Sequence, residues 1–152
     1  IRSATPEDGR LLAGWAQAMA RETEDKILPD AAIVPGIANG IANPALARYF
    51  IAELNGTPAG TLMLTEEWSD WRNGMWRWIQ SVYVAPEYRR RGIYRALYAH
   101  VQAMAEADGQ VCGIRLYVED GNHSAQQTYT QLGMQDAHYR IYEHLITKQG
   151  LE

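Results

Sequence analysis

The sequence has only one cysteine (Cys112), one phenylalanine and two lysines among its 152 residues. A single cysteine excludes an intramolecular disulfide, and it cannot complete a four-ligand structural zinc site with the scattered histidines. No stretch approaches the roughly 18–20 uninterrupted apolar residues that a membrane-spanning helix needs. The N-terminus also lacks the basic, apolar and small-residue pattern of a secretory signal. We therefore expect a cytoplasmic protein without a metal site and without a membrane partner.

The sequence lacks the excess of positive charge that a nucleic-acid-binding surface needs. Fourteen basic and 18 acidic residues give a net charge of −4, which argues against general affinity for nucleic acid. Twelve of the 14 basic residues are arginines, and four of them fall within seven positions: Arg89, Arg90, Arg91 and Arg95. Such a local basic cluster favours one small anionic ligand, whereas the alternative is an ordinary solvated helix start.

The hydrophobic pattern predicts one globular domain over residues 1–152, of the α+β class. Apolar residues at helical spacing predict helices over residues 5–22, 30–42, 92–107 and 120–132, the second interrupted at Pro35-Gly36. Bulky and β-branched residues predict strands over residues 1–5, 49–54, 59–64, 76–84, 111–118 and 137–145, with turn residues filling 65–75. Strands in a run followed by β-α-β predict a mixed, mostly antiparallel sheet flanked by helices.

The chemistry is expected where the strand over 76–84 meets the helix over 92–107. The strand ends at Pro86, an arginine-rich turn follows, and Gly92 stands where a backbone must approach something closely. Exposed N–H groups at a helix start bind anions, and arginines add charge-assisted hydrogen bonds to phosphate. These residues predict a pyrophosphate ligand. The turn is not a P-loop, because the Gly-Lys-Ser/Thr ending is missing, and it is not a dinucleotide fingerprint, because it has one glycine.

Two motifs in this chain resemble those of the GNAT superfamily of N-acetyltransferases. Arg89-x-x-Gly92-x-Tyr94, preceded by Val82-Tyr83-Val84-x-Pro86, is similar to the family's acyl-CoA pyrophosphate motif, Gln/Arg-x-x-Gly-x-Gly/Ala. Tyr94 departs from that pattern, because the family has a small residue there. Asn122-x-x-Ala125-x-x-x-Tyr129-x-x-Leu132-Gly133 resembles the family's closing segment. The resemblance implies the GNAT fold over nearly the whole chain.

The resemblance also implies an activity, transfer of an acetyl group from acetyl-CoA to a small-molecule amine by direct attack on the thioester. Tyr129 is then the catalytic acid beside the CoA sulfur, and Asn122 bonds the pantetheine arm. The strand end and the turn hold the rest of acetyl-CoA through Val82, Tyr83, Val84, Arg89, Arg90, Arg91, Gly92, Ile93 and Tyr94.

The acceptor side is less defined by the sequence. Where the family often has a basic carboxylate on the strand before the motif, this chain has Trp78 and Gln80. The neighbouring acids are alternative bases acting through water: Glu66, Glu67 and Asp70, with His138 and Glu143 as further candidates. Four tryptophans lie within eleven residues, which suits core packing, a pocket wall for a cationic amine, or a homodimer contact. We take the substrate-binding residues to be Glu66, Trp71, Trp78 and Gln80.

Other readings of the same residues stay open. One is acetylation of a protein N-terminus or a lysine side chain, which needs a long open groove. Another is a non-catalytic acyl-CoA sensor, favoured by the missing carboxylate at positions 78 and 80. Tyr129 favours chemistry over sensing.

Overall fold

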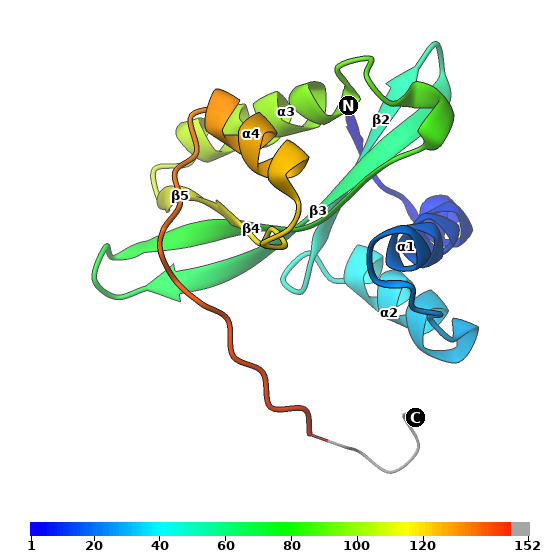
Figure 1. The fold of residues 1–152 in the computed structure, drawn as a ribbon, viewed down its shortest axis with the longest axis horizontal. Coiled ribbons are helices and arrows are strands. Elements are labelled where there is room, and N and C mark those ends of the chain that lie inside the picture. Colours follow the sequence, from blue (N-terminus) through cyan, green and yellow to red (C-terminus); the bar gives the residue numbers. More distant parts are fainter. Residues whose placement is uncertain (147–152) are drawn as a thin grey trace. The chain divides into compact units, whose positions relative to one another are not determined.

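In the computed structural model, which describes residues 1–146, the chain forms two compact units, residues 1–116 and residues from 117 onward. The first unit holds a five-stranded sheet in the order β1-β2-β3-β4-β5 (Figure 1). Its strands are β1 (Arg2–Ser3), β2 (Arg48–Leu54), β3 (Thr57–Ser69), β4 (Gly74–Val84) and β5 (Val111–Leu116). The first four pair antiparallel, and β5 pairs parallel to β4. The prediction of a mixed, mostly antiparallel sheet is confirmed.

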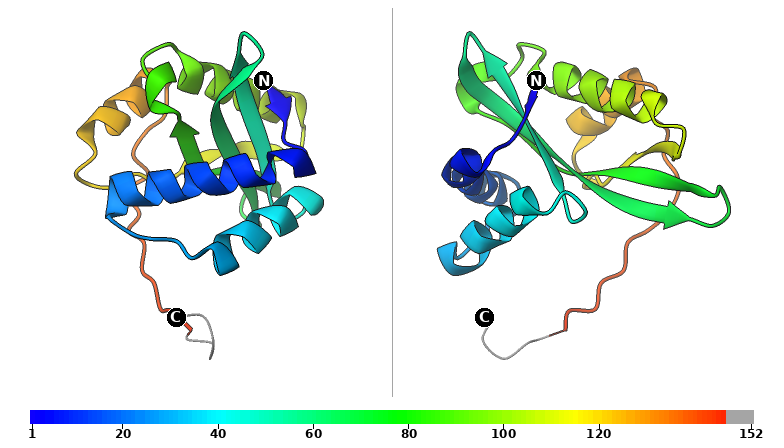
Figure 2. Two further views of the ribbon diagram at one scale, coloured as in Figure 1. Left: turned by 90° about the vertical axis from the view of Figure 1, so that its right-hand side faces the viewer. Right: turned by 180° about the vertical axis from the view of Figure 1, so that it is seen from behind.

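Helices cover both faces of this sheet. Figure 2 shows α1 (Gly9–Glu24) and α2 (Asp30–Ala42) on one face and α3 (Ile93–Ala107) on the other. Short 3₁₀ turns, η1 (Pro6–Asp8) and η2 (Pro86–Tyr88), precede α1 and α3. The apolar residues whose helical spacing predicted α3 are the residues that this helix buries. Leu97 and Val101 are almost wholly inaccessible to solvent. Each such side chain contributes about 1.5–3 kcal/mol to stability.

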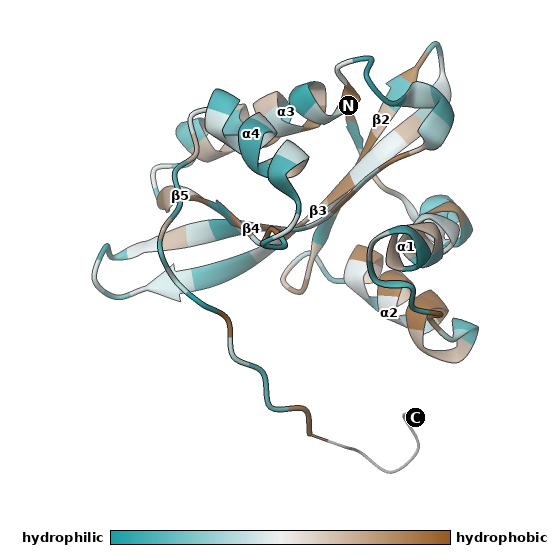
Figure 3. Cartoon of the chain, in the orientation of Figure 1, coloured by the Kyte–Doolittle hydropathy of each residue, from teal (hydrophilic) through white to brown (hydrophobic). Residues whose placement is uncertain are grey.

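The hydrophobic core lies where the middle of the sheet passes between the helices. On the α1 and α2 side, Leu12, Ala13, Ile37 and Ile51 form one buried cluster. Figure 3 shows hydrophobic residues concentrated in this central region, while the outer part of the β3–β4 hairpin is paler or hydrophilic. The part of the sheet away from the core is therefore built largely from polar and aromatic residues.

The β3–β4 hairpin is longer than its sequence pattern predicts. Residues 65–75 were expected to be turn residues, but β3 continues to Ser69 and β4 begins at Gly74. The expectation was wrong because polar side chains pair across the two strands. Glu66 lies opposite Arg77 and forms an ion pair with it, and Glu67 accepts a hydrogen bond from the indole N–H of Trp78 at 2.6 Å.

Helix α2 is confirmed, but its expected interruption is wrong. Pro35 lies inside the continuous helix Asp30–Ala42. A proline removes the hydrogen bond to the carbonyl four residues earlier, here that of Ala31. Both Pro35 and Ala31 are exposed, so water can satisfy that carbonyl.

The second unit contains α4 (His123–Gln131), which confirms the last predicted helix. The strand predicted over 137–145 is wrong, because residues 134–146 have no regular secondary structure. Tyr139, Ile141 and Leu145 have strand-like spacing but are strongly exposed. Spacing alone cannot make a strand, since the ladder needs a hydrogen-bonded neighbour. Across residues 1–146, no helix is both long and apolar enough to cross a membrane.

Candidate functional site

A bulge in β4 separates two differently paired halves of that strand. Ser81 lies opposite Met63 and Ile79 lies opposite Leu64, so Gln80 is an extra residue that faces no partner on β3. On its other side, β4 pairs with β5 only from Met75 to Ile79 within the described residues. The half after the bulge therefore has an edge without a neighbouring strand. Bulges commonly redirect a strand in this way beside functional sites.

The open edge of β4 presents backbone groups to a ligand. The Ala85 N–H donates to the Ala59 carbonyl on β3 at 3.0 Å. Because backbone groups alternate direction along a strand, those of Val82 and Val84 point away from β3. Consistently, the Val84 carbonyl accepts a hydrogen bond from Arg89 Nε at 2.9 Å rather than from β3. The N–H groups of Val82 and Val84 are thus directed to the open edge.

The turn between β4 and α3 has the conformation of an anion-binding loop. Arg90 has φ +63° and Gly92 has φ +78°, both left-handed. Left-handed residues within a turn direct successive N–H groups toward one side, where they bind anions. The first hydrogen bond into α3 runs from the Ala96 N–H to the Gly92 carbonyl at 3.0 Å. The N–H groups of residues 93–95 therefore lack an acceptor inside the helix, as at any helix start.

Gly60 on β3 sets how closely α3 approaches the sheet. A Cβ atom built on Gly60 would lie 2.8 Å from the Tyr83 carbonyl oxygen and 3.1 Å from Cγ2 of Ile93. Ile93 is the first residue of α3, so the missing side chain lets the helix start sit directly against β3 and β4. This contact fixes the anion-binding turn next to the open edge.

The arginines of the turn have different environments. Arg89 is held in place, because its Nη2 lies 2.6 Å from Oε2 of Glu22 on α1 and its Nε donates to Val84. The Arg91 guanidinium lies over the Tyr88 ring at 5.9 Å, and Arg90 is exposed. Arg90 and Arg91 thus extend the positive charge of the turn into solvent, while the charge of Arg89 is balanced by Glu22.

Glu22 also connects the turn to Tyr83, a connection that the sequence analysis missed. The Tyr83 hydroxyl donates to Oε1 of Glu22 at 3.2 Å. Burial, and then the nearby Glu22 carboxylate, raise the pKa of Tyr83. Glu22 is 61 and 67 positions away from its two partners, so no local sequence signal indicates it.

Tyr94 occupies the position where the sequence departs from the family motif. Its ring lies 6.3 Å from the ring of Tyr98, one helical turn further along α3. The aromatic side chain thus lies alongside its own helix.

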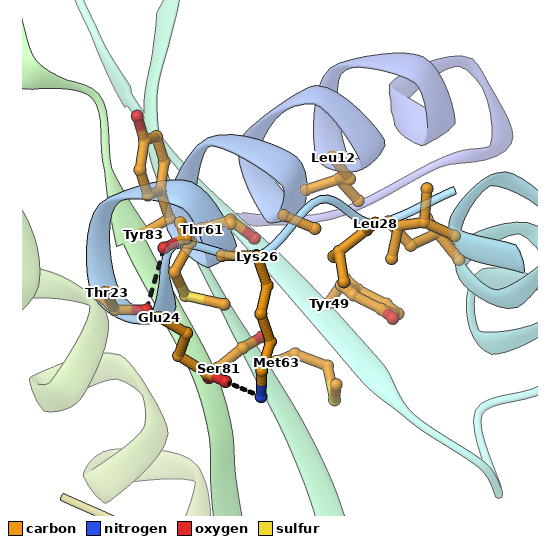
Figure 4. A pocket seen from close by; sticks show the side chains of 15 residues that line it. Leu12, Thr23, Glu24, Lys26, Leu28, Tyr49, Thr61, Met63, Ser81 and Tyr83 are labelled. Atoms are coloured by element: carbon orange, nitrogen blue, oxygen red, sulfur yellow. Dashed lines mark hydrogen bonds and ion pairs between the residues drawn. The ribbon is translucent and has the colours of Figure 1, made fainter. Parts of the chain in front are cut away.

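A cavity of about 340 Å³ lies between α1, α2 and the sheet. Figure 4 shows side chains from both helices and from β2, β3 and β4 around it. Ten of its 15 lining residues are apolar or aromatic, and they are Leu12, Ala16, Met19, Ala20, Leu28, Ile33, Ile37, Tyr49, Met63 and Tyr83. The five polar ones are Thr23, Glu24, Lys26, Thr61 and Ser81. Of these residues, only Tyr83 was predicted from the sequence to belong to a site, and for a different role.

The four predicted acceptor residues do not come together in this cavity. Glu66 lies on the face of the sheet opposite the cavity, where it forms an ion pair with the buried side chain of Arg77. Trp71 is 88% exposed in the hairpin turn, and Gln80 is exposed at the bulge. Trp78 lies on the same face of the sheet as the cavity, beside Glu67, but does not line it. Their role in acceptor binding stays a prediction.

One further cluster lies on that same face of the hairpin. The Arg115 guanidinium stacks 3.9 Å above the Trp76 ring and forms an ion pair with Glu67 at 3.0 Å. This engages the Glu67 carboxylate, one of the predicted bases. Within residues 1–146, no group of three or more histidine, cysteine, aspartate and glutamate side chains is arranged to hold a metal ion.

In the second unit, Asn122 caps α4. Its Oδ1 accepts a hydrogen bond from the Ala125 N–H at 3.1 Å, which leaves its amide NH₂ as a donor. Tyr129 lies on α4, and burial raises the pKa of its phenol. A tyrosine phenol is protonated at neutral pH even without this rise.

Comparisons with known proteins connect these features to one family. The model of the acetyltransferase (GNAT) family matches residues 9–134. A solved structure described as a possible acetyltransferase from Clostridium difficile 630 is 35% identical, covers 97% of each chain and has a TM-score of 0.90. No curated protein sequence matches the chain.

More distant solved structures share the fold. The ribosomal-protein-alanine N-acetyltransferase from Brucella melitensis biovar Abortus 2308 is 16% identical, with 95% of this chain and 97% of that chain covered and a TM-score of 0.74. AAC(6')-Iy, in complex with a bisubstrate analogue of CoA and acetylneamine, is also 16% identical. It covers 96% of this chain and 97% of its own, with a TM-score of 0.77.

Proposed function

The chain belongs to the acetyltransferase (GNAT) family, and we propose that it transfers the acetyl group of acetyl-CoA to a primary amine of a small molecule. The observation that carries the proposal is the left-handed turn at Arg90 and Gly92, which joins the open edge of β4 to the start of α3. This arrangement offers backbone donors for a diphosphate and, next to them, backbone donors for an extended arm.

Two parts of the first unit would bind acetyl-CoA. The N–H groups at the start of α3, together with the side chains of Arg90 and Arg91, hold the diphosphate. The N–H groups of Val82 and Val84 bind the pantetheine arm and the thioester carbonyl oxygen. A preorganised N–H donor at that oxygen stabilises the negative charge that develops there during attack. Arg89, bonded to Val84 and Glu22, positions the turn relative to this edge.

The reaction forms a carbon–nitrogen bond, breaks a carbon–sulfur bond and moves one proton from nitrogen to sulfur in net terms. The lone pair of the neutral amine attacks the thioester carbonyl carbon, the carbon–sulfur bond breaks, and the departing thiolate takes a proton. We assign that proton to the Tyr129 hydroxyl, on the strength of its motif position. A tyrosine phenol carries the proton that this role requires at neutral pH, although the burial that raises its pKa makes it a weaker acid. The amine nitrogen gives up a proton to water as the amide forms, and solvent returns a proton to the acid. Asn122 donates its amide N–H to the pantetheine arm.

Release of free CoA thiol in the presence of acetyl-CoA and amines tests the proposal. We expect steady turnover, and we expect Tyr129→Phe to lower kcat by about 10²–10⁴-fold, the usual contribution of a positioned proton donor. Tyr139→Phe is the matched control, because Tyr139 is 79% exposed in the same unit and is expected to leave kcat unchanged.

Three results would contradict the proposal or one of its parts. CoA binding without turnover on any amine would indicate a sensor. Equal kcat for the wild type and Tyr129→Phe would remove the assigned acid. Turnover on peptides but not on small amines would instead support the alternative of protein acetylation.

Cytoplasmic location and a homodimer belong to this proposal as predictions from composition. The exposed Trp68 and Trp71 of the hairpin are the surface on which the dimer prediction rests. Sedimentation of the purified protein, compared with a Trp71→Ala variant, tests it.

A further inference from the structure

We infer that the cavity between α1, α2 and the sheet binds the acceptor, and that it selects a primary monoamine carried on a compact apolar body. The inference rests on the proposed acetyl transfer for the reaction that follows binding. It adds the class of acceptor, which neither the family match nor the structural neighbours define for this chain.

The cavity lies against the part of β4 that follows the bulge. Ser81 and Tyr83 both line the cavity, and Val82 lies between them. Side chains alternate between the two faces of a strand, while backbone groups point along the sheet. The side chains of Ser81 and Tyr83 therefore reach a molecule in the cavity, while the backbone of Val82 between them points to the open edge. This places the acceptor beside the strand segment assigned to the thioester.

The cavity is small. Its volume is about 340 Å³. This lies at the lower end of the range for ligand sites. A single ring with a short aminoalkyl chain fits that size. An aminoglycoside with several rings, or an extended peptide, would place only one part of itself inside.

The walls select for apolar character. Leu12, Met19, Ile37 and Met63 offer no hydrogen bonds, and the Thr61 hydroxyl already donates to the Phe50 carbonyl at 2.8 Å. A polar acceptor placed there would lose its hydrogen bonds to water without replacement, which costs affinity. The Ser81 hydroxyl, on β4, offers an acceptor for the N–H of the reacting amine.

The charges around the cavity do not favour a polycation. Glu24, at the end of α1, is the carboxylate of the lining, and it forms an ion pair with Lys26 (Figure 4). The next acid on the same helix, Glu22, is paired with Arg89. Each of these two acids is therefore balanced by a basic side chain. A polyamine would bring additional positive charges without finding uncompensated negative ones.

A panel of amines with matched size and different charge tests the inference. With acetyl-CoA saturating, we expect kcat/KM for 2-phenylethylamine to exceed that for spermidine and for neamine by at least tenfold. A preference for either polycation would overturn the inference while leaving acetyl transfer to amines intact.

Variants that change the cavity give a second test. Ala16→Phe, which fills the cavity, should raise the KM for 2-phenylethylamine at least tenfold without changing the Kd of CoA. Ala38→Phe is the control, because Ala38 is exposed on α2 and does not line the cavity. Met19→Ala, which enlarges the cavity, should raise kcat/KM for the longer 4-phenylbutylamine relative to 2-phenylethylamine. This variant keeps the test valid if Ala16→Phe does not fold.

Calorimetry with 2-phenylethylamine alone separates failure of the inference from failure of the proposed function. Binding to the wild type and its loss in Ala16→Phe would support the apolar amine site even in a protein without turnover. Absence of binding together with absence of turnover on this amine would overturn the inference.

Discussion

Replacing Asp8 by asparagine should make the stability of this protein less dependent on acid pH. The Asp8 carboxylate accepts two hydrogen bonds from Arg2, at 2.7 and 2.9 Å, and one from the Thr5 N–H at 2.8 Å. These bonds, those from Arg2 above all, lower the pKa of Asp8 from 3.8 to about 2, against the opposing effect of its burial. The contact joins β1 to the start of α1.

The magnitude follows from the shift in pKa. A fall of almost two units corresponds to about 2.5 kcal/mol of stability, and we expect about 2 kcal/mol because Arg2 is partly exposed. The folded-state pKa is the lower one, so this stability is complete above the unfolded-state pKa near 4. It is lost as the pH falls toward 2, where the folded state also takes up the proton.

Urea denaturation followed by tryptophan fluorescence measures this effect. At pH 7, Asp8→Asn should unfold with about 2 kcal/mol less free energy than the wild type, and the difference should shrink toward zero between pH 4 and pH 2. Asp120→Asn, at an exposed position in the second unit, is the control. A difference that stays constant from pH 7 to pH 2 would refute the assigned ion pair.

The remaining predictions concern the elements that hold the site. Gly60→Ala should lower stability by about 1–3 kcal/mol and weaken CoA binding, because its methyl group meets the Tyr83 carbonyl; unchanged CoA affinity would contradict the packing argument. In Gly92→Ala the added methyl group meets open space, but the residue must keep φ +78°. Thermal denaturation should therefore show a loss of only about 1–2 kcal/mol in stability, and a larger loss would indicate a steric clash. Glu66→Gln removes a partner of buried Arg77 and should lower the free energy of unfolding by about 1–3 kcal/mol; an unchanged free energy of unfolding in urea would contradict the assigned ion pair.

The part of the site that could be predicted from the sequence is its local part. Pro86 and Gly92 mark the end of β4 and the beginning of α3, and both boundaries were located within a residue or two. The apolar spacing that predicted α3 is also the spacing of its buried residues Ile93, Leu97 and Val101. These signals are readable because they depend on backbone geometry and on periodicity within one segment.

The part that could not be predicted depends on contacts between distant segments. The role of Glu22 requires knowing that the end of α1 passes Tyr83 and Arg89. The cavity combines residues from five elements, and although α1 supplies six of the fifteen, the sequence does not show which other segments they face. The polar part of the hairpin is likewise stabilised by pairs such as Glu66 with Arg77, which single-strand patterns do not reveal.

The strand wrongly expected over 137–145 shows the opposite limit. Tyr139, Ile141 and Leu145 have the spacing of a strand, yet this segment has no regular secondary structure. Periodicity describes how a segment would pair if a neighbour were available. It does not supply the neighbour.

Calorimetric titration with CoA and with pantetheine tests the central claim most directly, because pantetheine has the same thiol arm but lacks the diphosphate. If the N–H groups at the start of α3 and the exposed Arg90 and Arg91 bind the diphosphate, CoA binds at least 100-fold more tightly than pantetheine. The Arg90→Ala, Arg91→Ala double variant then loses most of that difference. Equal affinities for the two compounds, or no heat of binding with CoA, would contradict the account.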